Sequence, residues 1–229
     1  MGKGKSNINK SSHKASVGEE KVLTSTGEID LTGMPLVYGE KDPYLTGAGR
    51  ATIEAFEAKK KGAKVENILL IDENGNSIYE KRGGRNSVGS PIYYNQQSVA
   101  LSHNHPRYQP GEEGLLSGTF SNADLLNFVK YDKQITKRAV GKEGTYSISK
   151  TSSFDKTGFA TFAKASSKQH VSTYRDEARR IQQSFKDKSI SWSDYSAGID
   201  KAFNQMLINC HNDLLANQEK YGYHYTLEK

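Results

Sequence analysis

Residues 101–124 read LSHNHPRYQPGEEGLLSGTFSNAD and hold the strongest structural and functional signal of the chain. His103 and His105 alternate at the end of an apolar run, and residues i and i+2 of a strand point to the same side of a sheet. Pro106 follows directly and is expected to end this strand. A helical pattern of apolar residues comes next, with Asp124 in its first turn. Both imidazoles and this carboxylate can therefore meet between the end of a strand and the start of a helix.

This set of side chains predicts a zinc site. Two histidines and one carboxylate, with an open fourth position, are typical of catalytic rather than structural zinc. The chain has a single cysteine, Cys210, which excludes a disulfide framework and a cysteine-based zinc site. The helical pattern around Cys210 predicts that this cysteine is a small buried side chain. The remaining histidines have no partner pattern and are expected at the surface or in packing: His13, His170, His211 and His224.

The pattern around this stretch predicts an α/β (α+β) domain with a mixed sheet flanked by helices. The tight turn ENGN joins two strands into a hairpin, and a second hairpin turns around KEG. In chain order we expect a helix at 48–61, strands at 65–72 and 76–84, a strand at 97–103, a helix at 121–134 and a hairpin at 135–150.

Three segments are expected along the chain. Residues 1–30 are polar and rich in Gly, Ser and Lys, which predicts a disordered basic arm. Residues 31–150 form the globular domain, in which 31–47 is a loop across the surface. Residues 151–229 are expected to be a C-terminal helical extension, with helices at 168–186 and 193–219.

The second of these helices carries an apolar stripe. We expect a packing surface that folds back on the domain or docks on another chain. The stripe consists of Phe203, Met206, Leu207, Leu214 and Leu215.

Composition and charge exclude some classes of function. The apolar fraction is 34% and mean hydropathy is −0.74, and no apolar run approaches the length of a membrane span. The N-terminus has no apolar core of a secretory signal, so we expect a cytoplasmic protein without membrane contact. The net charge of +6 is spread thinly along the chain, whereas nucleic-acid binders usually concentrate basic residues on one face. Nucleic acid is therefore a disfavoured partner.

The run HNHP followed by S-x-x-D resembles the motif of the JAB/MPN (JAMM) metalloprotease family. That family shows H-x-H-P, then S-x-x-D, with a glutamate far upstream, and its RadC-like bacterial and phage branch favours HNHP itself. Glu66, in AKVENILLID, matches the upstream glutamate. The resemblance covers about 48–150, which is under half of the chain. The chain departs from the family in the spacer at 107–120, which is longer than the usual one.

The resemblance implies a role for each matched residue. His103, His105 and Asp124 would bind Zn²⁺, and a water would take the fourth position. Glu66 would act as general base, and Ser121 would donate a hydrogen bond to the developing oxyanion. Glu80, on the return strand of the first hairpin, is the alternative base.

The long spacer lies beside the expected metal. It suggests a substrate clamp, a lid or a plug. Tyr108, Leu115 and Leu116 are candidates for substrate contact, and Glu112 or Glu113 is a candidate for capping the metal site.

The resemblance implies a zinc-dependent peptidase or isopeptidase that acts on a protein or peptide substrate. Because HNHP…SNAD domains of this kind occur in bacterial and phage proteins, a phage or mobile-element protein, cytoplasmic or associated with the virion, is expected. The alternative is a catalytically inactive JAB-like module that docks on a larger assembly through the N-terminal arm and the C-terminal helices. A protein associated with nucleic acid is the third hypothesis, and it requires strongly salt-dependent binding.

Overall fold

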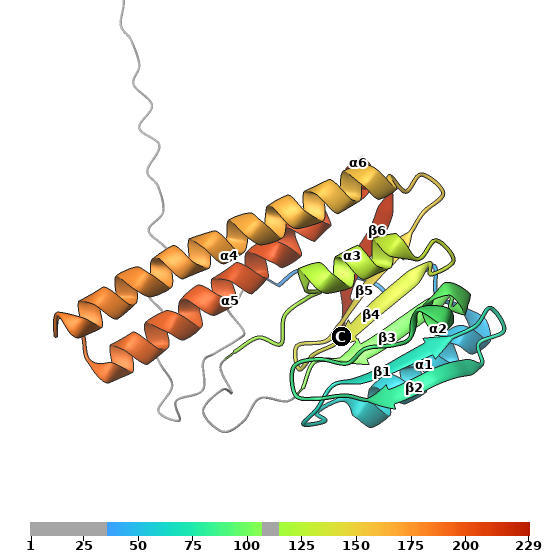
Figure 1. Ribbon diagram of the computed structural model, residues 1–229, viewed down its shortest axis with the longest axis horizontal. Helices are drawn as coiled ribbons and strands as arrows, with labels where there is room; N and C mark the ends of the chain where they lie inside the picture. The colour runs from blue at the N-terminus through green and yellow to red at the C-terminus, as the bar shows by residue number, and fades with distance from the viewer. Residues whose placement is uncertain (1–35, 107–114) are drawn as a thin grey trace, which may run out of the picture.

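The computed structural model describes residues 36–106 and 115–229. A six-stranded sheet lies at its centre, in the order β2-β1-β3-β4-β5-β6 (Figure 1). The expected arm at 1–30 lies outside the described residues, as do His13, Tyr108, Glu112 and Glu113.

The sheet is mixed, because β3 and β4 are parallel while the other neighbouring strands are antiparallel. Helix α3 supplies the crossover between the two parallel strands, as parallel pairing requires. The strands are β1 (Asn67–Ile71), β2 (Ser77–Arg82), β3 (Ala100–Asn104), β4 (Thr136–Val140), β5 (Thr145–Lys150) and β6 (Tyr223–Glu228). The helices are α1 (Gly47–Lys60), α2 (Ile92–Gln97), α3 (Asn122–Lys130), α4 (Lys156–Lys186), α5 (Trp192–Ala216) and α6 (Gln218–Tyr221). The predicted α+β class is confirmed.

Helices cover both faces of the sheet, and strand β3 shows how the two faces differ. Ala100 packs in a cluster with Ile53 of α1, and the Ser102 hydroxyl donates to the Glu57 carboxylate of α1 at 2.8 Å. The alternate side chains of β3, Leu101 and His103, therefore point to the opposite face. Helix α3 packs on that face, so the candidate zinc ligands lie between the sheet and α3.

Helices α4 and α5 form a long antiparallel hairpin that packs beside α3 and extends past the sheet (Figure 1). The C-terminal segment is not purely helical, which corrects the prediction for residues 151–229. Strand β6 pairs with β5 along its whole length and closes that edge of the sheet. Tyr223 and Leu227 of β6 share one core cluster with Phe128 of α3. The boundary expected at residue 150 therefore does not separate two cores.

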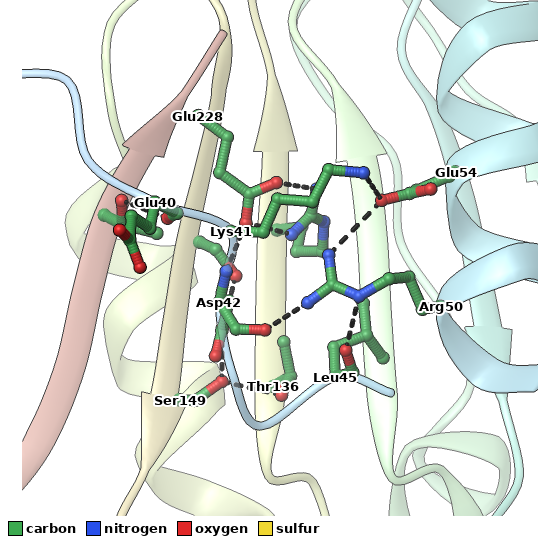
Figure 2. Close-up of polar contacts among 12 residues, drawn as sticks. Glu40, Lys41, Asp42, Leu45, Arg50, Glu54, Thr136, Ser149 and Glu228 are labelled. Atoms are coloured by element: carbon green, nitrogen blue, oxygen red, sulfur yellow. Dashed lines mark hydrogen bonds and ion pairs between the residues drawn. The ribbon is translucent and has the colours of Figure 1, made fainter. Parts of the chain in front are cut away.

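Buried charges hold the segment before α1 and the C-terminal strand on the α1 face of the sheet. The Arg138 guanidinium, 1% exposed, donates to both carboxylate oxygens of Glu57 and of Glu228, at 2.7–3.0 Å. The segment around Asp42 crosses this face, and its backbone amide donates to Glu228 at 2.8 Å (Figure 2). The Asp42 carboxylate accepts from the Ser149 hydroxyl at 2.6 Å. One polar network thus joins α1, β4, β5, β6 and the segment before α1.

Candidate metal centre

The two histidines meet at the end of β3. His103 lies on the strand opposite Ala139 of β4, and the backbone amide of His105 continues this pairing by donating to the Val140 carbonyl at 2.8 Å. Because the extended backbone persists through both residues, their rings lie on one side, with centroids 5.2 Å apart. The alternation expected from sequence therefore brings the two imidazoles together.

Asp124 is held in place by the start of α3. The Ser121 hydroxyl accepts from the Asp124 amide at 3.1 Å and donates to its Oδ2 at 2.6 Å. The Ser121 amide donates to the same Oδ2 at 3.0 Å, which completes a capping box. Since Oδ2 is taken by these bonds, Oδ1 is the oxygen that faces His103, 3.7 Å from Nε2.

The spacing of the three side chains suits a shared cation. One ligand atom from each of His103, His105 and Asp124 lies within 4.8 Å of the others. Among the described residues, this is the one group of three or more His, Cys, Asp or Glu side chains that could hold a metal ion. A separation of 3.7 Å is too long for a hydrogen bond. Two ligands of a tetrahedral zinc, each about 2.1 Å from the metal, lie about 3.4 Å apart. The donor types therefore suit zinc, and His103 and Asp124 lie near the spacing that zinc requires.

Hydrogen bonding orients one imidazole as a ligand, and burial keeps the other neutral. His105 Nδ1 lies 3.1 Å from the Ser117 carbonyl oxygen, which can only accept, so Nδ1 carries a hydrogen and Nε2 is the nitrogen that can bind a metal. Burial lowers the pKa of His103 to about 3, although the Asp124 charge opposes this effect. His103 is therefore a neutral imidazole, which is the form that binds a metal.

Lys137 is a charged neighbour of the site that the sequence analysis did not identify. Its ammonium lies 2.9 Å from Asp124 Oδ1 and donates to the Asp124 carbonyl oxygen at 3.0 Å, with 3% of the side chain exposed. Burial alone would raise the pKa of Asp124, but Lys137, together with His103 and Ser121, holds it well below its usual range. The carboxylate is thus ionised and already has a cationic partner. In sequence, Lys137 stands next to Arg138 in a strand, and strand alternation sends the two charges to opposite faces.

Glu66 lies in the same cleft as the metal-binding group. The cleft has a volume of about 320 Å³, and Glu66, His103, His105 and Asp124 all line it. Burial, followed by the charge of Asp124, raises the pKa of Glu66 to about 7. A carboxylate with this pKa can take and return a proton near neutral pH. Its backbone is fixed by two hydrogen bonds to the strand end at Gly83 and Gly84.

The other predicted site residues lie elsewhere. Glu80 forms an ion pair with Lys60 of α1 at 3.0 Å, so the alternative base is on the far face of the sheet. Leu116 is 1% exposed and its amide donates to Asn204 of α5 at 2.8 Å. It is an interior residue rather than a surface for substrate. Leu115 is half-buried and lines neither cavity beside the site.

Comparison of the chain with protein-family models, curated proteins and solved structures finds no match. No helix in the described ranges 36–106 and 115–229 is long and apolar enough to cross a membrane. The function is therefore inferred from the residues of the cleft and from their geometry.

Proposed function

We propose that this chain is a zinc-dependent peptidase or isopeptidase of the JAB/MPN type. The observation that carries the proposal is one cleft that brings together the ligand group His103, His105 and Asp124 with a carboxylate, Glu66, outside that group. Catalytic zinc sites combine three protein ligands with an open position, and they need a base that does not bind the metal. The cleft brings these groups together from residues that lie up to 58 positions apart, since Glu66 directly precedes β1 and Asp124 lies in the first turn of α3.

Zinc bound by these three residues would supply a polarised water of lowered pKa and a Lewis acid for the amide carbonyl. Glu66 accepts the proton of the attacking water and delivers it to the leaving amine, a cycle that suits a carboxyl whose pKa is about 7. Ser121 fixes Asp124 through its hydroxyl. To donate to a developing oxyanion, this hydroxyl has to turn away from Oδ2, and the backbone amide then retains the carboxylate.

The substrate that we propose is an extended stretch of peptide. Strand β2 is the outer strand on the β1 side of the sheet. The chain that follows it, from Asn86 to Ser90, lines the metal cleft. A peptide strand added along this edge would reach the metal cleft at residues 86–90, beyond the end of β2. Backbone pairing of this kind is a common mode of peptide recognition.

Metal content of the purified full chain, measured by native mass spectrometry after incubation with zinc, tests the proposal. We expect a single zinc per chain, lost in the double variant His103→Ala/His105→Ala. His170→Ala is the matched control, because His170 pairs with Asp213 at 2.8 Å away from the cleft. Zinc binding, together with peptide cleavage that is lost in Glu66→Gln, would support the peptidase function. A wild-type chain that takes up no zinc would contradict it.

A catalytically inactive JAB-like module of a larger, phage-encoded assembly is the second candidate. The observation that favours it is the Lys137–Asp124 ion pair, which balances the charge of the carboxylate without a metal. In this case the long α4–α5 hairpin would serve for docking on the assembly (Figure 1). The same zinc measurement separates the two candidates, because only the enzyme requires the metal.

A further inference from the structure

A second cavity, of about 420 Å³, opens next to the metal cleft. It lies where the start of α3 meets the α4–α5 hairpin. Four residues line both spaces, among them Glu66, His105 and Ser121. The two spaces therefore adjoin at the residues to which we assign the chemistry.

The cavity has mainly apolar walls, which come from three helices. Leu125 of α3, Phe162 and Val171 of α4, and Met206 and Leu207 of α5 line it. The charged residues Glu66 and Arg85 lie on the side nearest the metal cleft, since Glu66 and the neighbouring Asn86 line the cleft as well.

The polar groups of the helical wall are turned to other partners or are uncharged. The Ser166 hydroxyl donates to Asp213 at 2.6 Å. Burial raises the pKa of the Cys210 thiol to about 11, which keeps it neutral. A cavity with such walls suits an apolar group, and its volume falls in the range of small-ligand sites.

The loop before Ser121 is fitted closely to α5. Gly118 has a φ of +81°, and a Cβ at this position would lie 2.8 Å from Leu207 Cδ2. Glu143 holds the same loop by accepting from the Ser117 and Gly118 amides at 3.1 and 2.8 Å. The helical hairpin is therefore joined to the part of the chain that positions Ser121, and it forms one wall beside the site.

We infer that this cavity binds a large apolar side chain, aromatic or long aliphatic, of the residue next to the scissile amide in a peptide substrate. The inference rests on the proposed peptidase function and adds the specificity of the site. When a substrate side chain occupies the cavity, the substrate backbone lies beside Glu66 and His105, where its amide would be cleaved. Burial against apolar walls favours such a side chain over a charged one. The C-terminal hairpin thus determines which peptides are bound.

Cleavage of a peptide library by the zinc-loaded full chain tests the inference. We expect cleavage sites with Phe, Tyr, Leu or Met at one fixed position beside the cut, favoured over Asp by about tenfold or more. Ser167→Trp, at a half-buried position of the wall on α4, should fill the cavity and remove this preference. Thr173→Trp, at an exposed position of α4 that lines no cavity beside the site, is the control. Cleavage without a preference, or with one that Ser167→Trp leaves unchanged, would overturn the inference and leave the peptidase function standing.

A binding measurement keeps the inference testable if no peptide is cleaved. Cys210 is the single thiol of the chain and lines the cavity. Its alkylation by iodoacetamide is measured at pH 9, at which a small part of a thiol with a pKa of about 11 is ionised, and reports occupancy. Saturating N-acetyl-phenylalaninamide should slow alkylation by about tenfold, as expected for a site that is nine-tenths occupied, whereas the aspartate analogue should not. Protection without cleavage would support the cavity while contradicting the peptidase function. Equal alkylation rates with both compounds would overturn the inference.

Discussion

Lys137 and Asp124 form a buried ion pair of 2.9 Å directly beside the imidazole of His103. The ammonium and the imidazole face the same oxygen, Oδ1, because Ser121 holds Oδ2. The carboxylate that would bind zinc therefore has a cation beside it before any metal arrives. A metal at this site has to share the oxygen with Lys137 or displace it.

Zinc affinity should rise when the Lys137 charge is removed. Two unit charges 4 Å apart interact with about 4 kcal/mol at the effective dielectric constant of a protein surface, and the repulsion between an ammonium and a dication is larger. Asp124 keeps its orientation in Lys137→Met, since both bonds from Ser121 remain. We expect zinc to bind at least about tenfold more tightly, measured by competition with a chromophoric chelator.

Lys156→Met is the matched control for this variant, because Lys156 forms an exposed pair with Asp132 at 2.6 Å and neither residue lines the cleft. Its zinc affinity should equal that of the wild type. Weaker zinc binding by Lys137→Met would contradict the prediction and would mean that the lysine serves to orient the carboxylate.

Ser121 and Ser191 begin their helices with the same capping box. Comparing the two serines separates the structural role of Ser121 from its role at the metal site. Each hydroxyl binds the aspartate three residues later in nearly the same geometry, at 2.6 Å in one and 2.7 Å in the other. Ser121→Ala and Ser191→Ala should therefore each lower the free energy of unfolding by about 1 kcal/mol in urea denaturation. Only Ser121→Ala should also weaken zinc binding, by about tenfold, since Asp124 alone lies at the metal site. Equal zinc affinities in the two variants would show that Ser121 is only a helix cap.

This pair of caps shows what the sequence could predict about the site. The signal S-x-x-D forms a helix start at 121–124 and at 191–194. The same spacing at 152–155 and 184–187 does not, because Asp155 is itself the N-cap of α4 and Asp187 follows its end. The spacing alone therefore does not identify a cap, and the neighbouring HNHP indicates which occurrence carries a ligand. The histidine alternation was predictable because it depends on two residues of one strand.

Contacts between distant residues could not be predicted in this way. Arg138 meets Glu57 and Glu228, which lie 81 and 90 positions away, and no periodic pattern connects them. Lys137 likewise meets Asp124 only because α3 folds back over the sheet. Strand β6 alternates in sequence, as YHYTLE, but it directly follows a helix through Gly222, in a left-handed turn. The helical pattern before it therefore predicts a helical extension that continues to the end of the strand.

The buried guanidinium of Arg138 should be essential for stability. Its removal in Arg138→Met leaves two carboxylates, each less than a tenth exposed, without their cation. Loss of one partner from a buried ion pair costs about 3–5 kcal/mol. We expect a loss of this size in the free energy of unfolding, measured by urea denaturation with circular dichroism.

Two further variants test the electrostatic origin of this loss. Adding Glu57→Gln and Glu228→Gln to Arg138→Met should recover part of the stability, because the amides keep acceptor oxygens while the buried charges are removed. Arg180→Met, which breaks an exposed pair with Glu177 on α4, should cost less than about 1 kcal/mol. If the triple variant is no more stable than Arg138→Met, lost packing rather than charge accounts for the effect.

Lys150 is a buried ammonium at the end of β5. It is 8% exposed, its Nζ donates to the Tyr131 carbonyl at 2.6 Å and lies 4.7 Å from the centre of the Phe128 ring. Burial lowers the pKa of Lys150 to about 8, against an opposing effect of Asp132. The folded chain therefore releases this proton at a lower pH than the unfolded chain does.

Stability should consequently increase with pH in a window that Lys150 determines. Between pH 8 and the ordinary lysine value of 10.5, the unfolded chain binds this proton more strongly than the folded chain, so its contribution to the free energy of unfolding rises with pH. Buried tyrosines such as Tyr146, whose pKa burial raises from 10.0, act in the opposite direction above pH 10. The measurement is therefore urea denaturation from pH 7 to pH 10 of the wild type, Lys150→Met and the exposed control Lys81→Met. The stability of the wild type relative to Lys150→Met should improve as the pH rises past 8. A difference that stays constant over this range would show that Lys150 has the same proton affinity in both states.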